Sequence, residues 1–335
     1  MDSPEKLGFI LSYDYLKPSL CHDLIRLLDD TNFTHLFVPE IWGHDAFTQL
    51  ASMAQYTSNL TLGTGIVNLF SRTPATLAQT TASLNELTDG KFILGLGLSG
   101  PIVIKNWHGI NYYRVSPLQR TREYFEILRL IFSGDRVNYD GKLFKLKGFK
   151  LRGFDTPLNI PLFLAALGPK NLALAGEIAN GWFPIWTSFT ELPDLRKILE
   201  QGFKNRTSNL DKEVAIAPFI ITCASNTQKA ESLVKKHLAY YVGGMGTFYY
   251  EFMKRFGFES EANRIKIAWQ KGEREIAANN VSKDMLDRIA VLGSREDVTE
   301  RYKELRKLGV DIPVVMLPYN CPPEIAIETI GIFSE

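Results

Sequence analysis

The sequence predicts an α/β fold, a single (β/α)8 TIM barrel with insertion segments, on the basis of three observations. Short apolar runs alternate with amphipathic stretches from one end of the chain to the other. Strands that alternate with helices form parallel βαβ units. Eight such units can be traced without the repeated landmarks of a doubly wound sheet, and a length of 335 residues suits a barrel with insertions.

The expected strands are short runs of apolar and β-branched residues, a pattern typical of buried strands. In chain order they are Leu7–Leu11, His35–Val38, Leu60–Val67, Phe92–Leu98, Pro161–Ala166, Trp182–Ile185, Val214–Thr222 and Ile312–Leu317.

The expected helices carry apolar residues at helical spacing. Tyr124, Ile127 and Ile131, for example, share one face of a helix. Pro74 can occupy a first helical turn, where its missing N–H costs nothing. Helices are expected at Pro18–Asp30, Asp45–Ser58, Pro74–Leu87, Leu118–Phe132, from Lys170 onwards, and at Asp194–Phe203, Thr227–Tyr240 and Arg295–Leu308.

Two segments interrupt this alternation. Val137–Phe149 is expected to form a hairpin with Asp140 and Gly141 at its turn. Residues 243–288 are rich in aromatic residues and have a helical pattern, which predicts a helical insertion before the last strand. Because no linker rich in Pro, Gly or Ser divides the chain, residues 1–335 are expected to form one domain.

Composition excludes several classes of protein. Hydrophobic residues make up 45% of the chain and charged residues 22%, which is typical of a globular protein. The 38 Lys and Arg nearly balance the 37 Asp and Glu, so no overall field favours nucleic acid or an acidic membrane. No apolar run approaches the roughly 18 residues that suggest a membrane span. The N-terminus also lacks the apolar core of a signal peptide.

The three cysteines, Cys21, Cys223 and Cys321, lie far apart and show no metal-ligand spacing. An odd and sparse set of this kind favours free thiols in a reducing cytoplasm, which is the expected location. No metal site is expected. The motifs of zinc proteases, serine hydrolases and P-loop enzymes are also absent from the sequence.

Ligands of such barrels bind on the loops that follow the strands. After the fifth strand, Gly168 precedes a helix that begins near Lys170. The free N–H groups at such a helix start, beside a cationic side chain, can bind a phosphate. The alternative is an ordinary turn with an exposed lysine.

Two glycines, Gly63 and Gly65, interrupt the third strand. Glycine within a strand indicates a bulge or a close backbone approach to a ligand. Asn68, just beyond, can offer its amide to a ring edge. The alternative is a barrel corner that needs small residues for packing. The glycines of the fourth strand lack the spacing of a dinucleotide-binding motif, which excludes a Rossmann site there.

The stretches TLGTGIVNLFSRTPATLAQTTASLNELTDGKFILGLGLSGP and LAALGPKNLALAGEIANGWFP carry a family resemblance, as do PEIWGHDAFT, the NWHG loop and GTFYYEFMKRFGF. The sequence resembles the luciferase-like monooxygenase superfamily, and within it the branch that uses the deazaflavin coenzyme F-420. That branch includes methylenetetrahydromethanopterin reductase and the F-420-dependent glucose-6-phosphate and alcohol dehydrogenases.

The resemblance implies a cofactor site built from several loops. A non-proline cis peptide at Gly65-Ile66 would lie against the deazaflavin ring. Asn68, Leu98 and Ser99 would line the ring or the ribityl chain. The cofactor phosphate would be held by Leu167, Gly168, Lys170 and Asn171. Ser12, in the loop after the first strand, is placed in the same site.

The sequence departs from its F-420 relatives at two positions with a chemical role. Where many relatives have Asp-His after the second strand, this chain has Glu40-Ile41, and Gly100 replaces an acid near the end of the fourth strand. Glu40 is then the first candidate for a proton carrier, with His44 or His108 as weaker ones. As a cofactor-binding residue, Glu40 could instead form a hydrogen bond to the cofactor ring. Trp42 completes the predicted catalytic set, because it follows the same strand.

Three functions remain open from the sequence. The first is an F-420-dependent oxidoreductase that transfers a hydride to or from a small organic substrate. The second is a monooxygenase that uses reduced FMN and oxygen, and the third is a non-catalytic flavin-binding relative. Relatives form dimers or larger assemblies, so a homo-oligomer is expected.

Overall fold

The computed structural model of the chain describes residues 5–11, 18–112, 116–186, 189–207, 210–225 and 228–334. The chain divides into two compact units. The first unit comprises Met1–Phe33, Pro184–Asp194 and Ile216–Glu335, and the second comprises Thr34–Phe183 and Leu195–Ala215. Every helix in the described part of the chain is too short or too polar to cross a membrane.

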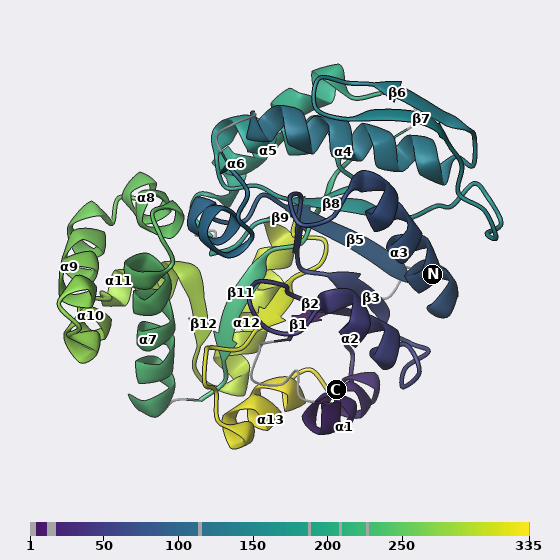
Figure 1. Cartoon of the computed structure of the whole chain (residues 1–335). Helices are drawn as coiled ribbons and strands as arrows, with labels where there is room; N and C mark the ends of the chain where they lie inside the picture. The colour runs from purple at the N-terminus through teal and green to yellow at the C-terminus, as the bar shows by residue number, and fades with distance from the viewer. Residues whose placement is uncertain are drawn as a thin grey trace. The chain divides into compact units, whose positions relative to one another are not determined.

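The second unit contains five neighbouring parallel strands in the order β2-β3-β5-β8-β9 (Figure 1). A short strand, β4, also pairs in parallel with β5. The elements of this unit are β2 (His35–Val38), α2 (Ala46–Met53), β3 (Thr61–Thr64), β4 (Val67–Asn68), α3 (Pro74–Leu87), β5 (Phe92–Gly97), the π-helix η2 (Val103–Trp107), α4 (Pro117–Phe132), β6 (Val137–Asp140), β7 (Lys145–Phe149), β8 (Leu162–Ala165), α5 (Pro169–Ile178), β9 (Gly181–Phe183) and the 3-10 helix η4 (Gly202–Asn205). Two further elements, α6 (Leu192–Gln201) and β10 (Ala215–Ile216), span the boundary between the units.

The first unit contains four neighbouring parallel strands in the order β1-β13-β11-β12. Helices α7, α9 and α10 pack against one another beside them (Figure 1). The elements are β1 (Gly8–Ile10), α1 (Pro18–Asp29), β11 (Phe219–Cys223), α7 (Gln228–Gly244), α8 (Phe248–Arg255), α9 (Glu259–Gln270), α10 (Arg274–Asn279), α11 (Lys283–Ile289), β12 (Ala290–Leu292), α12 (Arg295–Lys307), β13 (Val314–Met316) and α13 (Pro323–Gly331).

Most predicted elements are present, and the differences have local causes. The predicted third strand is divided into β3 and β4, because the cis peptide at Gly65-Ile66 interrupts it. The predicted strand Val214–Thr222 is likewise divided, into β10 and β11, around Pro218, which has no N–H to donate. The helix predicted over Asp45–Ser58 ends at Met53.

Three further elements were not predicted, one of which is the C-terminal helix α13 (Pro323–Gly331). β12 pairs with β11, but three residues that directly follow a helix carry too little periodicity to be recognised. The segment around Trp107, expected as a loop, is a π-helix. Helices α8 to α11 occupy most of the segment predicted as a helical insertion.

Packing between strands explains one of the two glycines of the third strand. A Cβ atom on Gly63 would lie 2.7 Å from the backbone oxygen of Ile93, which no side chain can tolerate. Gly95 on β5 is similarly restricted, since its Cβ would lie 2.0 Å from the oxygen of Thr64. For Gly63 the packing alternative is therefore sufficient, and no ligand is needed to explain it.

The predicted hairpin forms β6 and β7, and its loop is held by a carboxylate on α4. Glu123 is fully buried and accepts hydrogen bonds from the N–H groups of Lys142, Leu143 and Phe144. Gln119 donates a further one. Burial raises the pKa of Glu123, but these hydrogen bonds outweigh it, so that the pKa lies below its usual range.

The loss of this carboxylate is expected to have a pH-dependent effect on stability. A folded-state pKa below the unfolded value stabilises the protein above the unfolded value of 4.5, and this contribution is lost as the pH falls through the folded pKa. We therefore expect Glu123→Gln to lower the free energy of unfolding by about 1–3 kcal/mol at neutral pH. The difference from the wild type should shrink below about pH 4.5.

Urea unfolding at a series of pH values measures this difference. Glu86→Gln is a suitable control, because Glu86 is exposed on α3 and its replacement should change stability by less than about 0.5 kcal/mol. A Glu123→Gln deficit that stays constant down to pH 3 would contradict the assignment.

Candidate cofactor site

The loops that follow β2, β4, β5 and β8 leave the same edge of the parallel strands in the second unit, because the carboxyl ends of parallel strands lie together. These loops, together with the Gly65-Ile66 bulge between β3 and β4, the end of β4 and the first turn of α5, carry all but one of the residues that the sequence assigns to the cofactor site. Ser12 is the exception, since it lies outside the described residues.

The peptide bond between Gly65 and Ile66 is cis, which confirms the bond that the family resemblance implied. Two hydrogen bonds tie this bulge to the end of β2. The N–H of Gly65 donates to the oxygen of Val38 at 2.8 Å, and the N–H of Glu40 donates to the oxygen of Ile66 at 3.2 Å. The backbone of the bulge is therefore held in place by its neighbouring strand.

Asn68 is buried, with 4% of its surface exposed. Its Oδ1 atom accepts hydrogen bonds from the N–H groups of Phe70 at 2.9 Å and Ser71 at 2.8 Å. The amide oxygen therefore shapes the turn after β4. What remains for a ligand is the NH2 group of this side chain, which has two donors.

The backbone at Ser99, after β5, adopts a left-handed conformation with φ of 59°. Such a conformation is uncommon for a residue other than glycine, and its occurrences cluster at functional sites. Leu98 packs against a hydrophobic cluster of Phe70, Ile104 and Tyr112. A π-helix follows shortly afterwards, and short π-helical segments are also frequent at functional sites.

Helix α5 begins with an N-cap that has no side chain to satisfy the first N–H groups. Gly168 is the N-cap residue and Pro169 the first helical residue, so the N–H groups of Lys170 and Asn171 are the first that a ligand could reach. A Cβ on Gly168 would meet nothing within 4 Å, and its φ of −90° suits any residue. Neither packing nor backbone conformation therefore requires glycine at this position, whereas the close approach of an anion would.

Asn171 contributes a buried acceptor to the same loop. Its Nδ2 atom lies 3.5 Å from the backbone oxygen of Ala165, and its Oδ1 is buried with no partner in the described part of the chain. A buried acceptor without a donor lowers the stability of the folded protein. A hydroxyl group of a ligand would satisfy it.

The carboxylate of Glu40 is fully engaged by its neighbours. Arg72 donates two hydrogen bonds to it, at 2.6 and 2.9 Å, and the N–H of Ala46 donates a third at 3.1 Å. The two side chains are only 14% and 18% exposed. Arg72 also pairs with Asp45, the N-cap of α2, and lies 4.8 Å above the ring of Phe47. This arrangement suits a structural anchor of the loop after β2 better than a proton carrier.

The remaining predicted catalytic residues lie on the surface of the same loop. Trp42 is 46% exposed and packs edge-on against Trp107, with ring centroids 5.2 Å apart. His44 is exposed, and its Nδ1 lies 3.4 Å from Nε2 of Gln49. His108 is exposed beside Trp107. The structure thus places Trp42 and Trp107 together, while the two histidines point to no common partner among the described residues.

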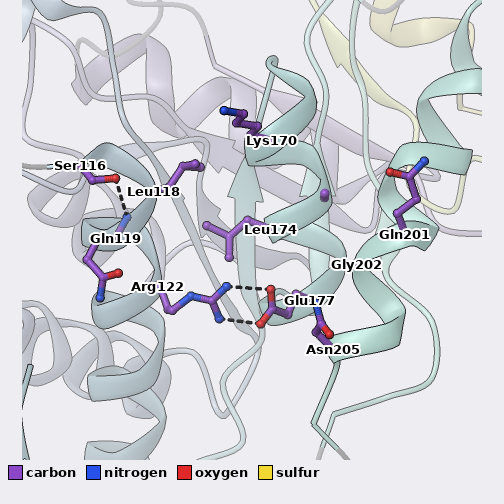
Figure 2. A pocket seen from close by; sticks show the side chains of 11 residues that line it. Ser116, Leu118, Gln119, Arg122, Lys170, Leu174, Glu177, Gln201, Gly202 and Asn205 are labelled. Carbon is purple, nitrogen blue, oxygen red and sulfur yellow. Dashed lines mark hydrogen bonds and ion pairs between the residues drawn. The ribbon is translucent and has the colours of Figure 1, made fainter.

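A surface cavity of about 270 Å3 is lined by residues of α4, α5 and η4 (Figure 2). Its two facing charges already neutralise each other, because Arg122 donates to both carboxylate oxygens of Glu177 at 2.6 and 2.7 Å. Lys170 lies at its margin, and is the one residue that this cavity shares with the predicted cofactor loop. The cavity therefore does not replace the strand-end site as the candidate.

Two residues that contact predicted site residues, Arg72 and Trp107, were not identified from the sequence. Arg72 follows the third strand by only a few residues, but nothing in a linear pattern connects it with Glu40, 32 positions earlier. Trp107 lay in a segment expected to be a loop, and its contact with Trp42 joins two different loops. In the described part of the chain, no group of three or more His, Cys, Asp or Glu residues is arranged to hold a metal ion.

Comparison with known proteins identifies relatives over almost the full length of the chain. The family model of luciferase-like monooxygenases matches residues 17–312. A protein of Mycobacterium tuberculosis described as a coenzyme F-420-dependent oxidoreductase is 33% identical over 94% of this chain and 96% of its own. A 5,10-methylenetetrahydromethanopterin reductase of Archaeoglobus fulgidus is 28% identical over 92% of each chain.

Among solved structures, the coenzyme F-420-dependent tetrahydromethanopterin reductase of Methanopyrus kandleri superimposes with a TM-score of 0.84. The alignment covers 98% of both chains at 24% identity. This match confirms the predicted fold class, a TIM barrel of the luciferase-like type.

Proposed function

Because this chain belongs to the luciferase-like monooxygenase family, we propose that it binds the deazaflavin coenzyme F-420 and transfers a hydride between this cofactor and a small organic substrate. The chain is an oxidoreductase of that family, and relatives matched over more than nine-tenths of its length are described as F-420-dependent or as methylenetetrahydromethanopterin reductases. The choice of cofactor and the nature of the reaction are the proposal.

The observation that carries the proposal is the start of α5. The N–H groups of Lys170 and Asn171 have no side-chain cap, a Cβ on Gly168 would meet no protein atom within 4 Å, and the positive end of the helix dipole favours an anion there. A phosphate of the cofactor fits this position. The Oδ1 of Asn171, which has no partner among the described residues, fits a ribityl hydroxyl group.

The remaining loops would enclose the ring system. The bulge at Gly65-Ile66 offers a backbone surface held by β2, and the NH2 group of Asn68 offers two donors to a ring edge. Ser99, with its left-handed backbone, would line the opposite wall. The bound cofactor would supply the hydride chemistry, and the protein would orient it and exclude water.

We propose that Glu40 positions the loop after β2 and does not carry a proton. Its carboxylate already receives three hydrogen bonds, two of them from a cation. Trp42 and Trp107 would then form an apolar wall beside the ring, where water exclusion is needed. Catalytic roles for Trp42 and His44 stay predictions, as does assembly into a homo-oligomer.

Titration with each cofactor tests the proposal. We expect F-420 to bind saturably, with a change in its visible absorbance, and FMN to bind at least about tenfold more weakly. Tight FMN binding with oxygen uptake in the presence of a reductant would instead support the monooxygenase. If neither cofactor bound, the chain would be a non-catalytic relative, and the proposed function would be wrong.

A further inference from the structure

A second cluster of polar groups lies in the first unit and shares no residue with the candidate cofactor site. Its centre is the indole of Trp186, which follows β9 by three residues and is only 1% exposed. The rings of His237 and Tyr241 on α7 and of Tyr249 on α8 surround it, with centroids 4.7 to 5.7 Å from that of Trp186. The backbone of Trp186 is left-handed, with φ of 51°, which is a rare conformation for so large a residue.

The imidazole of His237 is a neutral donor. Its Nδ1 accepts a hydrogen bond of 2.9 Å from the N–H of Tyr319, so the single proton of the neutral ring is on Nε2. Burial lowers the pKa of His237 to about 3, which keeps the ring uncharged at neutral pH.

Two buried N–H groups in this cluster have no acceptor among the residues that the structure describes. Within the described residues, neither Nε1 of Trp186 nor Nε2 of His237 has a hydrogen-bond partner. Leaving a buried donor unpaired costs about 1–3 kcal/mol. The two rings are edge-to-face neighbours with centroids 5.7 Å apart, so both donors belong to one cluster. We call these two groups the Trp186–His237 donor pair.

The chemistry of the surroundings restricts what could bind. In the described part of the chain, no cation pairs with or stacks on Trp186, His237, Tyr241 or Tyr249. An anion buried there would be left uncompensated, which is costly, whereas a neutral oxygen acceptor needs only the two hydrogen bonds. The close packing of the rings also limits the ligand to a small group.

We propose that the Trp186–His237 donor pair is a binding site for the oxygen of a small neutral carbonyl compound, enclosed by the rings of Tyr241 and Tyr249. The site concerns binding alone and does not depend on the proposed function. Its occupant is a ketone, aldehyde or amide, because these offer a strong acceptor without charge.

Nuclear magnetic resonance of the indole N–H groups tests this site on the full chain without cofactor. The chain has five tryptophans, and Trp186→Phe identifies the Trp186 signal by its loss. Acetone serves as the neutral probe and acetate as the anionic one. We expect acetone to shift the Trp186 signal downfield saturably and acetate to leave it unchanged.

Trp182 provides an internal control. Its Nε1 already donates to the backbone oxygen of Ala166 at 3.0 Å, so its signal should not move with either probe. His237→Phe removes the second donor and should weaken acetone binding about threefold to tenfold. His237→Asn, which keeps both an acceptor for Tyr319 and a donor, should retain most of the affinity. If His237→Phe does not fold, the Nε2 signal of His237 in the Trp186→Phe protein reports on the second donor.

Four results would overturn the proposal. The Trp186 signal could stay unchanged at saturating acetone, or all five indole signals could shift alike. Acetate could act as strongly as acetone. A long-lived water molecule could also remain at the indole in the presence of acetone, in which case the donor pair holds structural water and nothing else.

Discussion

Replacing Gly168 with aspartate is expected to weaken cofactor binding about a hundredfold while leaving the protein as stable as before, or slightly more stable. The carboxylate introduced by Gly168→Asp would accept hydrogen bonds from the N–H groups of Lys170 and Asn171, because an N-cap side chain accepts from the second or third helical residue. It would therefore occupy the donors that we assign to the cofactor phosphate, and it would repel that phosphate. Charge-assisted hydrogen bonds contribute about 1.5–3 kcal/mol each, which justifies the size of the loss.

The cofactor-free Gly168→Asp variant is expected to be slightly more stable than the wild type. Helix α5 now has no side-chain cap, and an acidic N-cap stabilises a helix by a few tenths to about 1 kcal/mol. The added atoms meet open space at the Cβ position, so no clash offsets this gain.

Cofactor titration and thermal unfolding of the cofactor-free protein measure the two effects separately. Gly331→Ala is the matched control, since a Cβ there also meets open space, on α13 in the first unit. It should leave cofactor affinity unchanged. Wild-type affinity in Gly168→Asp would show that the phosphate does not bind at the start of α5.

The second large effect is expected from Arg72→Met, which should lower the free energy of unfolding by about 2–3 kcal/mol. The substitution leaves the carboxylate of Glu40 with one backbone donor, although only 14% of its side chain is exposed. A partly buried charge that loses its counter-ion is strongly destabilising, and the limited exposure of this pair moderates the loss. The loop after β2 should also loosen, because Arg72 joins it to the N-cap of α2.

Urea unfolding compares this variant with a matched change at the surface. Lys145→Met breaks an ion pair of 2.7 Å with Asp140, in which both side chains are more than three-quarters exposed, and should cost less than about 0.5 kcal/mol. In the double variant Glu40→Gln with Arg72→Met, the buried charge is removed and part of the stability should return. Equal losses for Arg72→Met and Lys145→Met would mean that the Glu40 pair is not an anchor.

Local signals in the chain were sufficient for much of the fold. His35–Val38 and Pro74–Leu87 have the predicted bounds, because a buried apolar run and a proline at the helix start are properties of consecutive residues. The hairpin was predicted for the same reason, although its loop covers residues 141–144 and Asp140 still pairs with Lys145 at the end of β6. β12 was missed because its three residues pack against β11, about 70 positions earlier, and this pairing leaves no local pattern.

In the candidate site, too, local features could be predicted and contacts between distant residues could not. The start of α5 could be predicted, since Gly168, Pro169 and Lys170 are adjacent in the chain. The cis peptide at Gly65-Ile66 was implied by family resemblance and is present, although nothing in the residue pattern alone required it. The role of Glu40 was predicted without knowledge of Arg72, and the contact with that cation changes the most suitable role from proton carrier to anchor.

For the stretch from Leu60 to Pro101, the sequence by itself predicted strands interrupted by glycines, and the family resemblance assigned them to one wall of a ligand site. Only the tertiary structure distinguished the glycines, because the reason for each depends on an atom from another strand or on its absence. Gly63 is needed for packing against the backbone of Ile93, whereas a Cβ on Gly168, far along the chain, would enter open space. The structure alone also brought Trp186 and His237 together, since their rings come from segments about 50 residues apart. Their N–H groups have no acceptor among the described residues, and burial, not sequence, makes this costly.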